Sequence, residues 1–339
     1  MSPTALPTIE LHRHLEGSLR IQSLIELAQI HKVPLPTEDP RELAQVAQVL
    51  EPMDGLDAVL AAFGLFQNAF RSLPAVERLA YEAVVDAALD GVRILELRFS
   101  PGFMAQPSGL DWDAMMDAIL TGVGRAEQEH DIAVGLIAIV SRIYGPDSAR
   151  ETAAFAANWR DALVGFDLAD VEEQWPARAF SEAIEPVHKT GLPVTVHSGE
   201  NTGPEHIRDS LDWLQAQRIG HGVSLIQDEG LMRRCADESI LIEACPTSNV
   251  RTRAVPSLEA HPARALLRAG VPVSINSDDP GLFDITLSGE LRLAETHMGF
   301  SEADIRATIQ CAYRGSFVPS ATKEQALADT PAWDFISLG

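Results

Sequence analysis

Eight short runs rich in β-branched residues, separated by stretches with helical spacing, constrain the fold of this chain more than any other feature. The strand-like runs are expected within residues 8–19, 91–99, 132–140, 163–169, 192–197, 218–221, 239–245 and 271–276. Apolar residues recur at helical spacing between them, as in residues 178–188, 205–216 and 262–269. Parallel strands need crossover connections and bury nearly continuous apolar runs, so this alternation predicts a parallel sheet covered by helices.

Potentially reactive side chains lie at the ends of the first, fifth, sixth and eighth runs: His12, His14, His197, His221 and Asp278. In an open sheet the first and last strands can lie far apart, whereas in a closed barrel they are neighbours. The chain also lacks a glycine-rich phosphate loop of either common kind. We therefore predict an α/β fold, a (β/α)8 TIM barrel, with the site at the carboxyl ends of its strands.

The chain has 339 residues, a length that a single barrel reaches when it carries insertions. We predict one domain over residues 1–339. Helices are expected at residues 21–32, 57–71 and 74–89, and residues 33–90 are expected to form a helical insertion that acts as a lid after the first strand. Val59, Leu60 and Phe63 recur at helical spacing there, and the alternative to a lid surface is a stripe packed on the core.

Composition excludes several classes of partner. The formal net charge of −23 disfavours nucleic acid, whose binding depends on phosphate neutralisation by Lys and Arg. No apolar run is long enough to cross a bilayer, and the first residues lack the basic start and apolar core of a secretion signal. Three cysteines outside any C-x-x-C pair fit a reducing compartment. We expect no membrane partner and a cytoplasmic location.

A metal site is the simplest explanation of the histidines. His12 and His14 lie on the same face of a strand, although an isolated H-x-H often occurs by chance. With His197 and Asp278 they make a nitrogen and oxygen ligand set that suits one zinc ion and leaves a position for water. A metal ion in such a site activates water, so we expect hydrolysis.

One ion per chain is expected rather than two. Related barrel hydrolases with two ions often bridge them with a modified lysine at a strand end, but Lys32, Lys189 and Lys323 lie at no strand end. A two-metal hydrolase of esters or cyclic amides is the alternative, and the missing lysine disfavours it.

Three further residues are predicted to act in catalysis. Glu200, just after the fifth strand, is expected to be a shielded carboxylic acid that donates a proton; a surface helix cap is the alternative. His221, between two glycines, would orient or deprotonate the attacking water, or else be a core histidine. Asp279 would accept a hydrogen bond from substrate, unless the Asp pair is only solvated. The remaining histidines are expected to be structural: His31, His130, His188, His206, His261 and His297.

Six motifs, in order along nearly the whole chain, resemble the adenosine deaminase family. They are E-L-H-R-H-L-E-G-S-L at 10–19, E-L-R-F-S-P at 96–101, H-S-G-E at 197–200, R-I-G-H-G at 218–222, E-A-C-P-T-S-N at 243–249 and N-S-D-D-P at 276–280. The resemblance implies a single-zinc (β/α)8 barrel that hydrolytically removes the amino group from C6 of an adenine ring and releases ammonia. It implies that Glu200 protonates ring nitrogen N1, His221 steers the hydroxide and Asp279 contacts the substrate and the attacking water. It implies four zinc ligands: His12, His14, His197 and Asp278.

Two positions depart from the pattern of the adenosine-specific members. Glu16 stands where those members usually have Asp, and Asp170 stands where they resemble D-L-A-G. These residues, together with His14 and Asp279, are the expected substrate-binding set. Arg20 would pair with an acidic group on a modified substrate, or would simply be solvated.

The expected substrate is a small purine, most simply adenosine or a close nucleoside analogue. Free adenine, an N6-modified adenine and an aminofutalosine-type nucleoside are the alternatives. A catalytically silent purine-binding relative is disfavoured, because every expected catalytic position is occupied.

Overall fold

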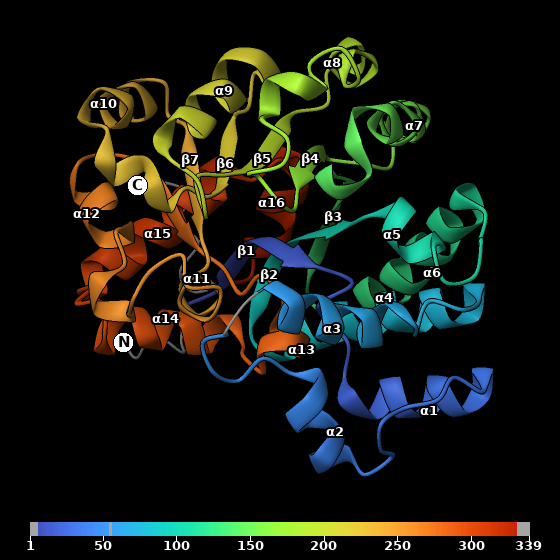
Figure 1. The fold of residues 1–339 in the computed structure, drawn as a ribbon. Coiled ribbons are helices and arrows are strands. Elements are labelled where there is room, and N and C mark those ends of the chain that lie inside the picture. Colours follow the sequence, from blue (N-terminus) through green and yellow to red (C-terminus); the bar gives the residue numbers. More distant parts are fainter. Residues whose placement is uncertain (1–5, 54–55, 331–339) are drawn as a thin grey trace.

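The computed structural model describes residues 6–53 and 56–330, with only the backbone for residues 56–61 (Figure 1). Its centre is one sheet of eight parallel strands, whose order in space follows the sequence. The strands are β1 (Thr8–His14), β2 (Val92–Phe99), β3 (Ala133–Ser141), β4 (Gly165–Ala169), β5 (Val194–Ser198), β6 (Arg218–His221), β7 (Leu241–Ala244) and β8 (Val273–Ile275).

Hydrogen bonds between β1 and the residues after β8 bring the first and last strands together. The backbone N–H of His14 donates to the carbonyl of Asp278 at 2.9 Å, and the Asp278 N–H donates to the carbonyl of His12 at 3.0 Å. Arg13 and Asp278 form a parallel bridge at the same point. The predicted (β/α)8 barrel is confirmed, and its closure brings Asp278 beside the two histidines of β1.

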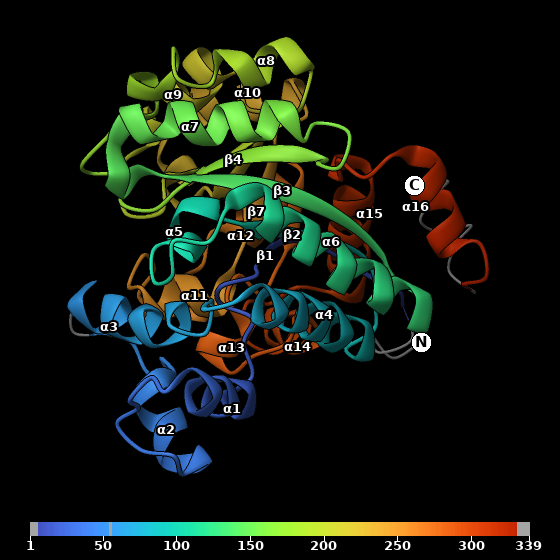
Figure 2. The same ribbon diagram turned by 90° about the vertical axis from the view of Figure 1, so that its right-hand side faces the viewer.

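Helices surround the barrel, as Figures 1 and 2 show. The α-helices are α1 (Ile21–His31), α2 (Pro40–Ala47), α3 (Leu56–Gln67), α4 (Leu73–Leu89), α5 (Pro101–Ala105), α6 (Trp112–Glu129), α7 (Gly145–Asn158), α8 (Glu185–Thr190), α9 (Pro204–Leu214), α10 (Glu229–Asp237), α11 (Pro246–Arg251), α12 (Ala263–Arg268), α13 (Pro280–Phe283), α14 (Leu287–Thr296), α15 (Glu302–Gly315) and α16 (Ser320–Leu327). Within the described part of the chain, no helix is both long enough and apolar enough to cross a membrane.

The segment between β1 and β2 contains two kinds of helix. The long helix α4 packs against β2 and α6, as the crossover helix of a βα unit does. Helices α1 and α2 project away from the barrel, and α3 lies between them and α5 (Figure 2). Phe63 of α3 meets Phe103 of α5 edge to face, with ring centroids 6.2 Å apart. Val59 and Leu60 fall outside the residues whose side chains are described.

Candidate active site

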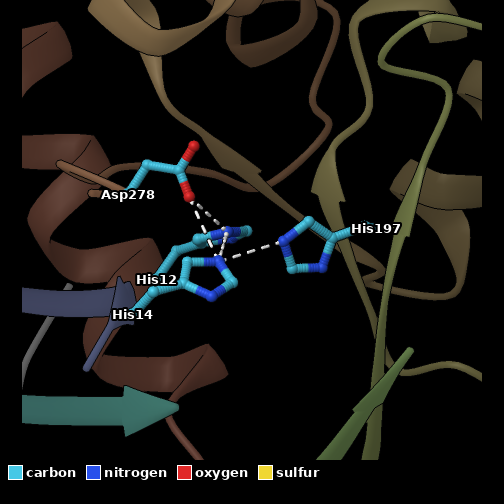
Figure 3. Close-up of side chains that lie close together, drawn as sticks. All are labelled: His12, His14, His197 and Asp278. Carbon is cyan, nitrogen blue, oxygen red and sulfur yellow. Dashed lines mark hydrogen bonds and ion pairs between the residues drawn. The ribbon is translucent and has the colours of Figure 1, made fainter. Parts of the chain in front are cut away.

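Four side chains from three strand ends converge on one point at the carboxyl end of the barrel (Figure 3). His12 and His14 come from β1, His197 from β5, and Asp278 from the loop after β8. His14 Nε2 lies 3.3 Å from His12 Nε2 and 3.2 Å from His197 Nε2. Asp278 Oδ1 lies 3.1 Å from His12 Nε2 and 3.2 Å from His14 Nε2.

These separations fit the coordination of one small divalent ion. Tetrahedral ligands about 2.0 to 2.1 Å from zinc are separated from one another by about 3.3 Å. Four of the donor–donor separations are 3.1 to 3.3 Å, close to that value, so the four atoms lie near enough to share one ion. The donor set of three imidazole nitrogens and one carboxylate oxygen is therefore suited to zinc or a similar ion, which these four residues would hold.

Two buried carboxylates orient the histidines. Glu243 Oε2 lies 2.7 Å from His12 Nδ1, and Asp167 Oδ1 lies 3.1 Å from His197 Nδ1. Each carboxylate accepts the Nδ1 proton, which leaves Nε2 unprotonated and directed at the common point. Burial also lowers the pKa of His197 well below its ordinary value, which favours the neutral ring that metal binding requires.

Glu243 is held in turn by two buried arginines. Its Oε2 accepts from Arg98 Nη2 at 2.9 Å, and its Oε1 forms an ion pair with Arg218 Nε at 2.7 Å. Arg98 also pairs with Asp167 at 2.8 Å, so one guanidinium links the carboxylates behind His12 and His197. Burial would raise the pKa of Glu243, but the two guanidiniums lower it well below its usual range, so it remains an anion.

Three site residues have a left-handed backbone although none is glycine. The φ angles are 74° at Asp170, 63° at His221 and 65° at Asp278. Such conformations cost about 1–3 kcal/mol each and persist where the surrounding structure imposes them. At the carboxyl ends of β4, β6 and β8 they place these side chains at the top of the barrel, where all three line one cavity.

The cavity above the four converging residues has a volume of about 470 Å³. Glu200 lines it from the loop after β5, and its Oε1 accepts from Thr252 Oγ1 at 2.9 Å and from Asn249 Nδ2 at 3.3 Å. Burial raises the pKa of Glu200 although His221 opposes the shift, so its protonated form persists to higher pH than that of a solvated glutamate. The arrangement gives the cavity a carboxylic acid able to donate a proton.

The loop that carries Glu200 is fixed by another buried acid, Glu172. The Glu172 carboxylate accepts from the backbone N–H of Gly199 at 2.6 Å and of Glu200 at 2.8 Å, and from Thr202 Oγ1 at 2.6 Å. These bonds set the direction in which the Glu200 side chain leaves the backbone.

The other wall of the cavity contains three acidic side chains, Glu16, Asp170 and Asp279. Burial raises the pKa of Glu16 to about 8, and burial and Asp278 raise that of Asp279 well above its ordinary value. Asp170 is open to the cavity, yet the protein around it also raises its pKa. Glu16 Oε2 and Asp279 Oδ1 are buried and have no hydrogen-bond partner among the described residues, so each is available to a ligand in the cavity.

Sequence reasoning did not assign functions to several residues that support the site: Arg98, Asp167, Glu172, Arg218, Glu243, Asn249 and His261. Four of them carried a signal that could have been used, because they are charged residues inside otherwise apolar strands, where burial requires a partner. His261 was expected to be only structural, but its Nε2 lies 3.1 Å from Asn249 Oδ1, and Asn249 contacts both Glu200 and His221. Arg20 lies elsewhere and pairs with Asp86 at 2.6 Å.

The closed barrel and the ligand cluster at its carboxyl end define a metal-dependent hydrolase. Residues 7–331 match the family model described as adenosine deaminase. An adenosine deaminase from Shewanella denitrificans is 37% identical over 305 residues, which cover 90% of this chain and 92% of that protein. The chain belongs to the adenosine deaminase family, as its motifs predicted, and is a metal-dependent aminohydrolase.

Solved structures agree with this assignment. An adenine deaminase from Arthrobacter aurescens superposes with a TM-score of 0.88 at 26% identity, covering 96% of this chain and 98% of that one. An amidohydrolase from Burkholderia ambifaria, solved with bound zinc, gives a TM-score of 0.88 at 27% identity and covers 98% of this chain and 92% of that one.

Proposed function

We propose that the protein is a zinc enzyme that deaminates adenosine, or a close nucleoside analogue, at C6 of the adenine ring. Water replaces the amino group, which gives the 6-oxo purine and ammonia. The observation that carries the proposal is the presence in one cavity of four side chains able to hold a metal ion and a partly buried carboxylic acid, Glu200, whose pKa is raised. The relatives named adenosine deaminase support the choice of substrate.

The metal in this proposal is one zinc ion per chain, held by His12, His14, His197 and Asp278. A zinc ion bound there lowers the pKa of a water molecule and so supplies the nucleophile near neutral pH. The close approach of the four donor atoms, their nitrogen and oxygen chemistry, and the zinc in the amidohydrolase structure support this choice of ion.

The residues around the cluster would divide the proton transfers and the positioning between them. Glu200, whose raised pKa favours the protonated form, would donate to ring nitrogen N1 as water adds to C6, which neutralises the charge that develops on the ring. His221 Nε2 lies 3.6 Å from Glu200 Oε2 and would orient the attacking water. Asp279 would contact the substrate and the attacking water through Oδ1, which has no partner among the described residues.

The acidic wall supports an uncharged substrate over a phosphorylated one. Glu16, Asp170 and Asp279 would accept hydrogen bonds from ribose hydroxyls or from the base, with His14 lining the same part of the cavity. Among the described residues, Arg253 is the one arginine or lysine that lines the cavity. A phosphate would meet little positive charge in this cavity, so adenosine 5′-monophosphate is expected to be a poor substrate.

Free adenine is the second candidate, because the Arthrobacter structure is an adenine deaminase. The test measures formation of the 6-oxo purine by the zinc-loaded protein from adenosine, adenine, an N6-methylated adenine, an aminofutalosine-type nucleoside and adenosine 5′-monophosphate; the amine released is ammonia, or methylamine from the methylated compound. We expect the highest kcat/KM with adenosine or a close analogue, and loss of activity on chelation with recovery on adding zinc. No 6-oxo purine from any of these compounds would refute the proposal, and two ions per chain in metal analysis would refute the single-zinc site.

A further inference from the structure

A series of buried hydrogen bonds, called the relay below, connects the start of α12 to His221 through His261 and Asn249. The backbone N–H of Ala263 donates to His261 Nδ1 at 3.2 Å. His261 Nε2 lies 3.1 Å from Asn249 Oδ1, and Asn249 Nδ2 lies 3.0 Å from His221 Nδ1. The three linked side chains belong to residues that are at most 6% exposed. His221 ends β6, Asn249 lies in α11, and His261 lies just before α12.

The backbone N–H of Ala263, at one end of the relay, determines which atom donates in each of its hydrogen bonds. A backbone N–H can only donate, so His261 Nδ1 must be unprotonated and the neutral ring carries its proton on Nε2. That proton is donated to Asn249 Oδ1, which leaves the Asn249 amide nitrogen facing His221. Burial lowers the pKa of His261 to about 4, so its ring is neutral at physiological pH.

The Asn249 side chain is fully used by these contacts. Its oxygen accepts from His261, one amide hydrogen is donated to His221 Nδ1, and the other points to Glu200 Oε1 at 3.3 Å. His221 Nδ1 must therefore be an acceptor, and a neutral His221 carries its proton on Nε2. That nitrogen faces the cavity, 3.6 Å from Glu200 Oε2.

We propose that Asn249 and His261 are positioning residues that fix His221 as its Nε2–H tautomer. In this form His221 donates a hydrogen bond to the attacking water and does not take a proton from it. Asn249 also contacts the carboxyl group of Glu200. It therefore fixes the position of His221, which would donate to the water, relative to Glu200, which would donate to the substrate ring. This role in catalysis rests on the proposed deamination, whereas the tautomer itself does not.

The tautomer can be measured directly by ¹⁵N NMR on the zinc-loaded protein labelled with [¹⁵N]histidine. Protonated and unprotonated ring nitrogens resonate well apart, and the His221→Gln variant assigns the signals of His221. We expect an unprotonated Nδ1 and a protonated Nε2 for His221 in the unmodified protein. A His221 that carries its proton on Nδ1 would overturn the proposal, whether or not any adenine derivative is deaminated.

Asn249→Asp reverses the relay, because a carboxylate accepts where the amide donated. We expect the His221 proton to move to Nδ1 in the NMR spectrum, and kcat to fall by roughly 10²- to 10⁴-fold with a smaller change in KM, as a wrong histidine tautomer does in other hydrolases. Zinc content should stay at one ion per chain. Full activity with an unchanged spectrum would refute the relay.

Two substitutions of His261 distinguish a role in the relay from a role in packing alone. His261→Phe fills the space but cannot donate to Asn249, whereas His261→Gln offers a side-chain N–H in a similar place. We expect His261→Phe to lower kcat and to give a mixture of His221 tautomers, and His261→Gln to restore most of both. Equal loss in the two variants would assign His261 to packing alone and contradict its part in the proposal.

Discussion

Replacing Glu200 by Gln tests the proposed proton donor with little change of shape. Gln keeps the oxygen that accepts from Thr252 at 2.9 Å and from Asn249 at 3.3 Å, so the free energy of unfolding should change by less than about 1 kcal/mol. What disappears is the acidic proton. Loss of a general acid costs roughly 10²- to 10⁴-fold in rate, which corresponds to about 3 to 5 kcal/mol in the activation barrier.

The pH dependence gives a second measurement on the same variant. The active form carries a protonated Glu200, so kcat/KM should fall as pH rises through the pKa of this group. Because burial raises that pKa, the fall should come at higher pH than for an ordinary glutamate. In Glu200→Gln this alkaline limb should vanish along with most of the activity, while zinc content stays at one ion per chain.

The matched control is Glu205→Gln, an exposed carboxylate in the first turn of α9. It makes the same chemical change five residues away and should leave kcat, KM and the pH profile unchanged. Full activity in Glu200→Gln, or the same loss in Glu205→Gln, would refute the assignment of Glu200 as the acid.

Three further substitutions follow from the geometry. A Cβ at Gly17 would lie 1.8 Å from Asp279 Oδ1, so Gly17→Ala should displace that carboxylate and lower kcat/KM by about 10²-fold in steady-state assays. Glu243→Gln removes the charge that His12 and two buried arginines share, so metal titration should show roughly 10- to 100-fold weaker zinc binding, and denaturation a loss of about 3–5 kcal/mol. Arg20→Ala breaks a partly exposed ion pair and should cost under about 1 kcal/mol without changing kinetics.

Each of these has a clear contrary result. Gly124→Ala is the control for Gly17→Ala, because a Cβ there meets nothing within 4 Å, and it should leave activity unchanged. Normal kinetics in Gly17→Ala would mean that Asp279 has no fixed position in catalysis. Unaltered zinc affinity in Glu243→Gln would remove its part in orienting His12, and a large rise in KM for Arg20→Ala would revive Arg20 as a substrate contact.

The clustering of the four residues proposed to bind metal could be predicted because its signal is local. His12 and His14 share one face of a strand by the two-residue period, and His197 and Asp278 follow short apolar runs that end at the same side of a parallel sheet. The supporting residues could not be paired in this way. Glu243 meets His12 across 231 residues of sequence, and nothing near either position specifies the other.

In the insertion after β1, the sequence likewise predicted the helices but not the elements against which they pack. Helical spacing predicted helices near residues 57–71 and 74–89, and α3 (Leu56–Gln67) and α4 (Leu73–Leu89) occur there. The two helices pack against different elements: α4 packs against β2, whereas α3 contacts α5 through Phe63 and Phe103. The helical spacing of apolar residues does not specify which element their face of the helix will pack against.

The sequence by itself determined which reactive side chains the protein has and that they lie at the carboxyl end of the barrel. Strand periodicity and the alternation of strands with helices are properties of contiguous residues, so they can be read from the sequence. Only the tertiary structure decided the state of those groups. Whether Glu200 holds a proton, and which nitrogen of His221 carries one, depends on burial and on hydrogen-bond partners from α11 and the chain beside α12. Those partners act through space over a few ångströms, and the fold alone brings them within that distance.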